Sequence, residues 1–136
     1  MAEQTLILIK PDGVKRRLTG EILRRIEAKG YQILDLRMFT PGRELLAQHY
    51  AEHEGKPFFE PLLEFMSSGS VVAVRAAGEG VIEGFRNIAG VSNPTEAAAG
   101  TIRGDLGRDW GVKVQQNLVH GSDSAVAAER ELALWF

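Results

Sequence analysis

One histidine lies where an apolar segment meets the start of a helix, a position that suits phosphate chemistry. Residues 112–119 predict a strand, residues 122–135 predict an amphipathic helix, and His120 joins the two. Either Ser122 or Asp123 can cap the helix by accepting a hydrogen bond from a first-turn amide. Unpaired amides and the positive end of the helix dipole favour an anion such as phosphate at this corner. His120 is therefore a candidate nucleophile, although this segment by itself is also compatible with an ordinary turn histidine.

Cationic and hydroxyl side chains elsewhere in the chain could gather around a phosphate. Lys10 ends an apolar segment, Arg86 lies on an expected helix, and Arg103 lies in a long loop. The hydroxyls of Ser92 and Thr101 are further candidates. Each residue alone is weak support, because surface cations usually serve solvation, and only their gathering around His120 would indicate a site.

Two common phosphate-binding loops are absent from the sequence. No G-x-x-x-x-G-K-[ST] run occurs, and Gly78-Glu79-Gly80 is followed by Gly84, one position too late for the dinucleotide fingerprint. Side chains must therefore hold any nucleotide. A ring of the Phe58-Phe59 pair could stack on a base if it is exposed beside a cleft, or could belong to the core.

His49 and His53 stand four residues apart on an expected helix, a spacing that can hold zinc. The pattern is not H-E-x-x-H, the chain has no cysteine, and no third ligand is evident. We therefore expect no dedicated metal site, and interpret the two histidines as residues that line a cleft or cover a helix surface.

Length and composition are typical of a globular protein with a single domain over residues 1–136. The chain is 44% hydrophobic and 25% charged, and a chain of this size buries about two-thirds of its unfolded surface. The net charge of −2 gives no general attraction to nucleic acid or acidic membranes. The sequence has neither a signal-peptide pattern at its start nor a segment able to span a bilayer, so we expect a cytoplasmic protein.

Hydrophobic periodicity predicts alternating strands and helices. Strands are expected at residues 5–10, 31–40, 71–76 and 112–119, and helices at residues 19–29, 43–54, 57–66, 79–88 and 122–135. Pro11-Asp12-Gly13 predicts a turn, and residues 90–110 predict a long functional loop. The order predicts an α+β fold of the ferredoxin-like, split βαβ kind. Its four-stranded antiparallel sheet would carry helices on one face, with further helical inserts around it.

Four segments, in order, resemble those of nucleoside diphosphate kinases. Residues 5–14 (TLILIKPDGV) resemble the opening strand and turn of that family. Residues 49–53 and 56–59 (HYAEH and KPFF) resemble its nucleotide-clamp helices. Residues 100–105 (GTIRGD) resemble its phosphate loop, and residues 117–123 (NLVHGSD) its catalytic signature. Because the matches run through nearly the whole chain, we expect the family's fold and activity.

The resemblance implies ping-pong transfer of a γ-phosphoryl group from a nucleoside triphosphate to a nucleoside diphosphate, through phosphohistidine on His120. It implies attack by Nδ1, with Glu131 orienting the ring through Ser122. A neutral imidazole has one lone-pair nitrogen, which can attack in line when the other is hydrogen-bonded. The migrating group carries spread negative charge, so catalysis would be mainly positioning and electrostatic stabilisation.

The resemblance also assigns nucleotide contacts to side chains spread along the chain. They are Arg86, Arg103 and Ser92 for the phosphates, Lys10 and Asn117 for the ribose 3′-hydroxyl and phosphates, Tyr50 for the transferring group, and Phe58 with Leu62 behind it for the base. Mg²⁺ would bridge phosphate oxygens and need few protein ligands.

The chain departs from the family pattern in its loops. The family usually has Thr in place of Ser92 and Pro in place of Ala99, so we expect weaker positioning and a less rigid loop, not lost activity. The stretch between Arg103 and Asn117 is a few residues longer than usual, in a loop that normally builds subunit contacts. We expect a homo-oligomer built from dimers, with the number of dimers left open.

Two other classes of function fit parts of the sequence. A ferredoxin-like regulatory module would bind nucleotide without transferring phosphate, but it would not need a nucleophile such as His120. A nucleic-acid-binding protein would need aromatic residues interleaved with basic ones on its strands, a pattern that these strands lack. We therefore expect nucleoside di- and triphosphates as partners, with no membrane and no specific nucleic acid.

Overall fold

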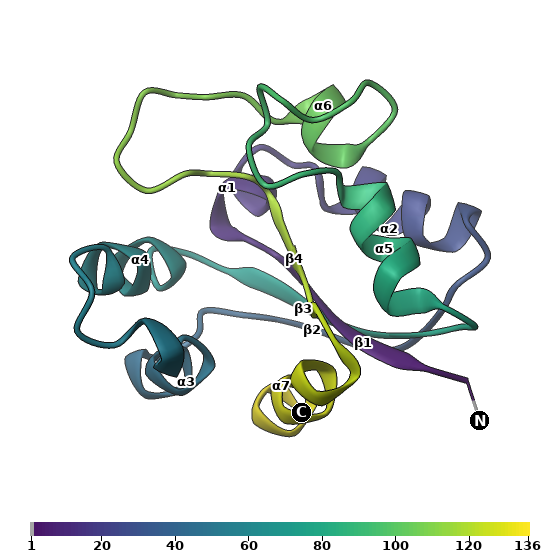
Figure 1. Cartoon of the computed structure of the whole chain (residues 1–136), viewed down its shortest axis with the longest axis horizontal. Coiled ribbons are helices and arrows are strands. Elements are labelled where there is room, and N and C mark those ends of the chain that lie inside the picture. The colour runs from purple at the N-terminus through teal and green to yellow at the C-terminus, as the bar shows by residue number, and fades with distance from the viewer. Residues whose placement is uncertain (1) are drawn as a thin grey trace.

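In the computed structural model, which describes residues 2–136, four strands form one antiparallel sheet in the order β2-β3-β1-β4 (Figure 1). The strands are β1 (Gln4–Ile9), β2 (Gln32–Phe39), β3 (Val71–Ala77) and β4 (Val119–Gly121). The central strands β1 and β3 are nearly continuous runs of buried residues, as expected where both faces of a sheet are covered. The strand order confirms the predicted α+β, ferredoxin-like fold.

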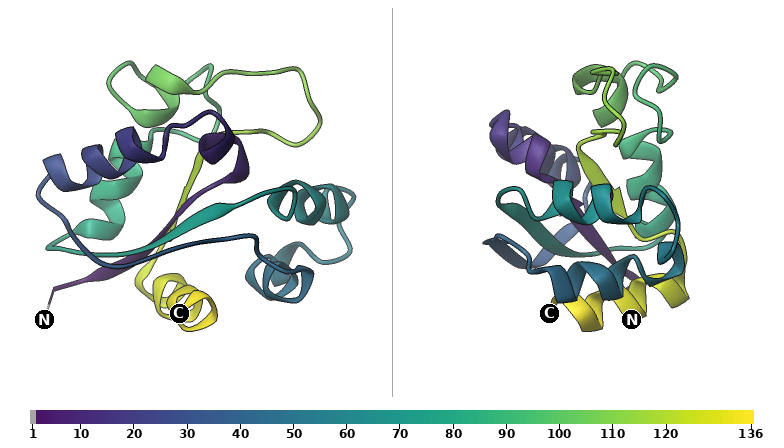
Figure 2. Two further views of the ribbon diagram at one scale, coloured as in Figure 1. Left: turned by 180° about the vertical axis from the view of Figure 1, so that it is seen from behind. Right: turned by 90° about the vertical axis from the view of Figure 1, so that its left-hand side faces the viewer.

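Helices cover both faces of this sheet. In chain order they are α1 (Pro11–Lys15), α2 (Thr19–Ala28), α3 (Arg43–His49), the 3-10 turn η1 (Ala51–His53), α4 (Phe59–Met66), α5 (Val81–Ala89), α6 (Ile102–Leu106) and α7 (Ala125–Trp135). Helices α2 and α5 pack on one face, and α3, α4 and α7 lie on the other (Figure 2). Strand β1 joins the two layers, because Ile7 and Ile9 belong to one core and Leu6 and Leu8 to the other. The sequence analysis expected helices on one face of the sheet, whereas helices cover both faces.

The fourth strand is shorter than the sequence pattern suggests. Residues 112–118 are irregular, and pairing with β1 is limited to Val119–Gly121. Leu118 has a left-handed backbone (φ +73°), which is incompatible with a strand because extended backbone requires a negative φ. His120 therefore lies within β4, opposite Leu8, and not in a turn that follows the strand.

Other differences concern helix boundaries. The expected helix over residues 43–54 is divided into α3 and η1, with the break at Tyr50. Pro11, expected in a turn, begins α1, where its missing N–H leaves no hydrogen bond unmade. The loop over residues 90–110 contains α6, whose N-cap Thr101 accepts a hydrogen bond from the Gly104 N–H.

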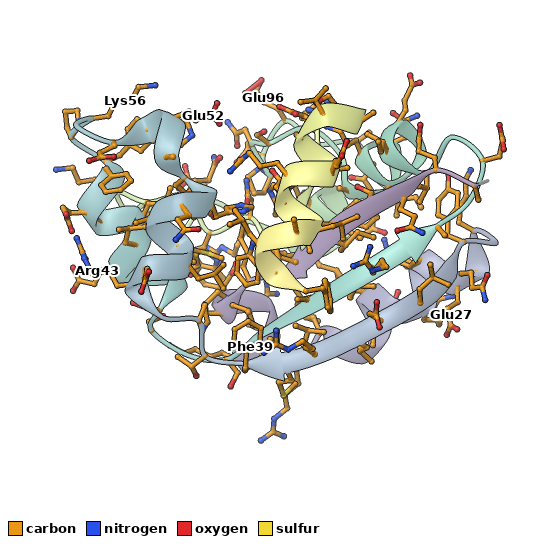
Figure 3. The ribbon with its side chains drawn as sticks, turned by 90° about the horizontal axis from the view of Figure 1, so that it is seen from below. Glu27, Phe39, Arg43, Glu52, Lys56 and Glu96 are labelled. Atoms are coloured by element: carbon orange, nitrogen blue, oxygen red, sulfur yellow. The ribbon has the colours of Figure 1, made fainter. Side chains whose placement is uncertain are left out.

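Helix α7 crosses the second face of the sheet and fixes the end of α3, which lies beside it (Figure 3). The Arg130 guanidinium donates hydrogen bonds to the carbonyls of Gln48 and His49, which end α3. A cation at a helix C-terminus satisfies carbonyls without intrahelical partners and complements the helix dipole. This contact places His49 next to α7.

The N-cap of α7 is Ser124, not Ser122 or Asp123 as the sequence suggested. Its Oγ accepts a hydrogen bond from the Ala127 N–H at 3.0 Å. We predict that Ser124→Ala lowers the free energy of unfolding by about 1 kcal/mol in urea denaturation, because a first-turn amide loses its partner. The control Asp123→Ala should change it by less than about 0.5 kcal/mol. A larger loss in the control than in Ser124→Ala would show that the cap is assigned to the wrong residue.

Candidate active site

A cleft of about 970 Å³ opens where β1, β4 and the ends of several helices meet. Most of the site residues expected from the sequence line it: Lys10, Tyr50, Arg86, Ser92, Arg103, Asn117, His120 and Glu131. They come from segments far apart in the chain, so the fold performs the gathering around His120 that the sequence could only suggest.

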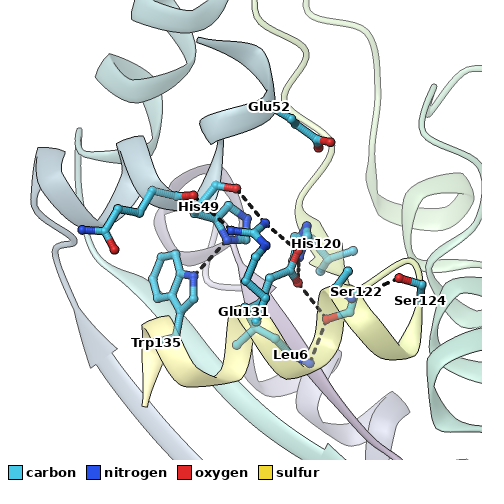
Figure 4. A network of polar contacts seen from close by, with 12 residues as sticks. Leu6, His49, Glu52, His120, Ser122, Ser124, Glu131 and Trp135 are labelled. Atoms are coloured by element: carbon cyan, nitrogen blue, oxygen red, sulfur yellow. Dashed lines mark hydrogen bonds and ion pairs between the residues drawn. The ribbon is translucent and has the colours of Figure 1, made fainter.

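The His120 ring is held from behind by a chain of hydrogen bonds (Figure 4). Its Nε2 lies 2.9 Å from Oε1 of Glu131, and the Ser122 hydroxyl donates to the same oxygen at 2.7 Å. Ser122 Oγ in turn accepts the Leu6 N–H of strand β1. Because an ionised carboxylate only accepts hydrogen bonds, Nε2 carries the proton, and Nδ1 is the lone-pair nitrogen of the neutral ring.

This arrangement corrects one expectation about Glu131. The family resemblance implied that Glu131 orients the His120 ring through Ser122. In the structure the Glu131 carboxylate contacts the His120 ring directly, and the Ser122 hydroxyl holds that carboxylate in place. Burial alone would raise the pKa of Glu131, yet the hydrogen bonds and charge of His120, together with Ser122, lower it. Glu131 therefore stays ionised and can stabilise positive charge on the ring.

A second histidine, His49, stands edge-on to His120 with ring centres 4.8 Å apart. The buried Trp135 indole donates its N–H to Nδ1 of His49 at 3.0 Å (Figure 4). The neutral His49 ring therefore carries its proton on Nε2. Burial, with the nearby His120 next in importance, lowers the pKa of His49 to about 3, so this ring is neutral at pH 7.

Lys10 and Asn117 form the floor of the cleft. The Lys10 ammonium donates to Asn117 Oδ1 at 2.8 Å, and Asn117 Nδ2 donates to the carbonyl of Ser92 at 3.0 Å. Burial and the charge of Arg103 lower the pKa of Lys10 to about 8. Lys10 is thus mostly charged at pH 7, in a place where its charge is poorly screened by water.

The two arginines differ in what they already bind. Arg103 donates hydrogen bonds to the carbonyls of Gly90, Asn117 and Val119, so it ties the loop before α6 to β4. A guanidinium has five N–H donors, which leaves Arg103 with donors for a ligand. Arg86 is exposed on α5. Burial lowers the pKa of Arg103 to about 10, and the charge of Arg86 is the next largest cause.

Three expected site residues do not line the cleft. Phe58 is exposed before α4, with its ring centre 5.1 Å from that of His53, which does line the cleft. Leu62 packs against the core beneath α4, and Ser122 is fully buried behind Glu131.

Tyr50 lines the cleft beside His49, and burial raises the pKa of its phenol, which therefore stays protonated.

Sequence reasoning missed the structural partners of the site. Trp135 lies four residues after Glu131, so both face the same side of α7, and this spacing could have indicated a shared role. Residues 107–111, in the loop expected to be longer than usual, lie outside the cleft lining. There, the guanidinium groups of Arg16 and Arg108 lie 5.7 and 4.4 Å from the ring centre of Trp110.

His49 and His53, whose i, i+4 spacing could have held zinc on a continuous helix, are split between α3 and η1. A different trio, His49, His120 and Glu131, offers three donor atoms within 4.8 Å of one another. These groups already hydrogen-bond to each other, to Ser122 and to Trp135, so their positions are explained without an ion.

Comparison with known proteins gives a consistent result. A family profile described as "Nucleoside diphosphate kinase" matches residues 3–136. Nucleoside diphosphate kinases of Mycobacterium tuberculosis (strain ATCC 25618 / H37Rv) and Mycobacterium bovis (strain BCG / Pasteur 1173P2) are each 57% identical, over 100% of this chain and 98% of theirs.

Solved structures show the same similarity. A nucleoside diphosphate kinase family protein from Babesia bovis superposes with a TM-score of 0.92 at 47% identity, over 98% of this chain and 88% of its own. The enzyme from Halobacterium salinarum in complex with CDP has a TM-score of 0.93 at 43% identity, over 100% of this chain and 88% of its own.

The fold and the site define a kinase that acts on nucleotides. The chain belongs to the nucleoside diphosphate kinase family, whose members transfer phosphate between nucleotides. Within residues 2–136, none of the helices combines the length and the apolar character that crossing a membrane requires.

The buried neutral His49 predicts a pH-dependent stability. The unfolded chain binds a proton on His49 near pH 6.5 and the folded protein only near pH 3, so stability falls as the pH falls through this window. Between pH 7 and 4.5 this effect amounts to about 2–3 kcal/mol. His49→Gln should remove that part of the slope in denaturation curves measured across this range. A variant with the wild-type slope would show that His49 is not held neutral by burial.

Proposed function

We propose that the protein transfers the γ-phosphoryl group of a nucleoside triphosphate to a nucleoside diphosphate in two steps, through phosphohistidine at Nδ1 of His120. The observation that carries this proposal is the hydrogen bond between Nε2 of His120 and Glu131 at 2.9 Å. It engages one ring nitrogen and makes the other the nucleophile, in a cleft lined by Lys10, Arg86 and Arg103.

In the first step, the Nδ1 lone pair attacks the γ-phosphorus in line, and the bond to the bridging oxygen breaks. The nucleoside diphosphate leaves with that electron pair. The ring becomes positively charged, and the ionised Glu131 stabilises its Nε2–H. In the second step, a terminal oxygen of another nucleoside diphosphate attacks the phosphorus, and the N–P electron pair returns to Nδ1.

Lys10, Arg86 and Arg103 would neutralise the charge on the transferring group, because all three line the cleft. Ser92 and Asn117 would place the phosphates and the ribose 3′-hydroxyl next to Lys10. The Tyr50 phenol, protonated through burial, can donate a hydrogen bond to a phosphoryl oxygen.

The base would stack on Phe58, whose exposed ring continues the cleft wall beyond His53, with Leu62 packed beneath. Stacking accepts any base through its π-face, so we expect broad base tolerance. Mg²⁺ would arrive with the nucleotide and be held mainly by phosphate oxygens and water, because it needs only one or two protein carboxylates. The exposed carboxylates of Glu52, Glu83 and Asp123 on the cleft wall could supply these.

Removing the nucleophile tests the proposal. We predict that His120→Ala loses phosphoryl transfer and incorporation of label from [γ-³²P]ATP, but still binds nucleotide, because the cations of the cleft remain. The wild type should carry acid-labile, base-stable label, and so should the control His53→Gln. Substantial turnover by His120→Ala would contradict the assigned nucleophile.

The proposed assembly is a homo-oligomer built from dimers that join at strand β2. This strand is an edge of the sheet (Figure 3), and Leu36 and Met38 on it are 52% and 60% exposed. An exposed apolar edge strand invites pairing with a second copy, and two-fold pairing of identical edges closes the assembly.

A charge on this edge tests the proposed dimer. We predict that Leu36→Glu reduces the sedimentation coefficient to that of a smaller species, because a buried unpaired carboxylate destabilises an interface. The control Val126→Glu changes a side chain that is 80% exposed on α7 and should sediment like the wild type. A monomeric wild type at micromolar concentration would rule out this assembly.

A further inference from the structure

A carboxylate outside the cleft, that of Asp12 in α1, is buried against Leu118, which immediately precedes the strand that carries His120. Its Oδ2 accepts the Leu118 N–H at 3.1 Å. Its Oδ1 is buried and has no hydrogen-bond partner within residues 2–136. A buried carboxylate oxygen without a partner is unfavourable for stability, so this residue is poorly explained by stability alone.

The peptide groups around Leu118 are held from both sides. The Asp12 carboxylate accepts the Leu118 N–H, and the Lys10 backbone N–H donates to the Leu118 carbonyl at 2.8 Å. Leu118 has φ +73°, a left-handed conformation that a leucine keeps only when its surroundings enforce it. The residues on either side are Asn117, which binds the Lys10 ammonium, and Val119, which begins β4. The Leu118 backbone therefore sets the positions of both Asn117 and His120.

Asp12 also supplies negative charge to the surroundings of Lys10. The charged and titratable groups that interact with the Lys10 side chain are Arg103 of α6, Asp12 of α1 and His49 of α3. Arg86 of α5, His120 of β4 and Glu131 of α7 line the same cleft as Lys10. Burial and Arg103 act against the ammonium, and Asp12 favours it. Without Asp12, Lys10 would lose its proton at a lower pH.

We infer that Asp12 is a positioning residue for phosphoryl transfer, which fixes the left-handed Leu118 and supplies negative charge beside the Lys10 ammonium. This inference rests on the proposed function, because it assigns Lys10 and His120 to the transfer. Asp12 itself does not line the cleft and would not touch the nucleotide.

The variant Asp12→Asn separates the two effects, because an amide oxygen can still accept the Leu118 N–H while the charge is gone. We expect the alkaline limb of kcat/KM to move about 1 pH unit lower than in the wild type. At pH 6.5 the variant should keep kcat within about threefold, because Lys10 stays charged there. Asp12→Ala also loses the hydrogen bond, and its kcat should fall at least about tenfold at every pH.

The titration of Lys10 can be measured without turnover, by NMR of protein labelled with ¹³Cε-lysine. The chain has five lysines, and the Lys10 signal is the one missing from Lys10→Met. Its midpoint should be lower in Asp12→Asn than in the wild type. As a control, Ile26→Val weakens the core under α2 but should leave that midpoint and the pH profile unchanged.

Equal Lys10 midpoints in wild type and Asp12→Asn would overturn the inference, as would a wild-type kcat in Asp12→Ala. The proposed function fails separately, if wild-type protein forms no phosphohistidine. In that case the NMR midpoints still decide whether Asp12 sets the charge of Lys10.

Discussion

The contact between the His120 ring and the Glu131 carboxylate is the interaction on which the site depends. It fixes which ring nitrogen holds the proton, orients the other toward the cleft, and places negative charge where the ring would become positive. The Ser122 hydroxyl supports it by donating to the same carboxylate oxygen, and the Leu6 N–H supports Ser122. The proposed nucleophile, the carboxylate that holds its ring and the sheet thus form one continuous hydrogen-bonded unit.

The fold provides this unit by crossing α7 behind the strand that carries His120. Glu131 and Trp135 lie one turn apart on α7, so one helix face presents a carboxylate to His120 and an indole to His49. On the open side the cations lie close together: besides burial, which is the larger cause, Arg103 lowers the pKa of Lys10 and Arg86 lowers the pKa of Arg103. Crowded cations of this kind are unfavourable in an empty cleft, and an incoming phosphate relieves that repulsion.

The sequence predicts the type and order of the central elements well, because β1 and β3 are strongly apolar and α2 and α5 have clear periodicity. It fails near the site. Residues 112–118 alternate like a strand but are irregular, and Leu118, whose N–H binds Asp12, is held in a left-handed backbone that no strand contains. Local pattern cannot show such long-range constraints, which join residues more than one hundred positions apart.

The candidate site residues were identifiable chiefly from motif resemblance, and the structure adds how they are held. Sequence alone could not show that Arg103 binds three backbone carbonyls, or that Trp135 sets the proton position of His49. Both depend on tertiary packing of distant segments. The cytoplasmic location, which rests on sequence alone, stays a prediction.

The most direct test is the position of the phosphate on wild-type protein after incubation with a nucleoside triphosphate and removal of free nucleotide. NMR of ³¹P, with ¹⁵N-labelled histidine, distinguishes the two ring nitrogens. With Glu131 engaging Nε2, we predict one phosphate per chain, bonded to Nδ1 of His120. Phosphate on Nε2, or on a residue other than His120, would contradict the account.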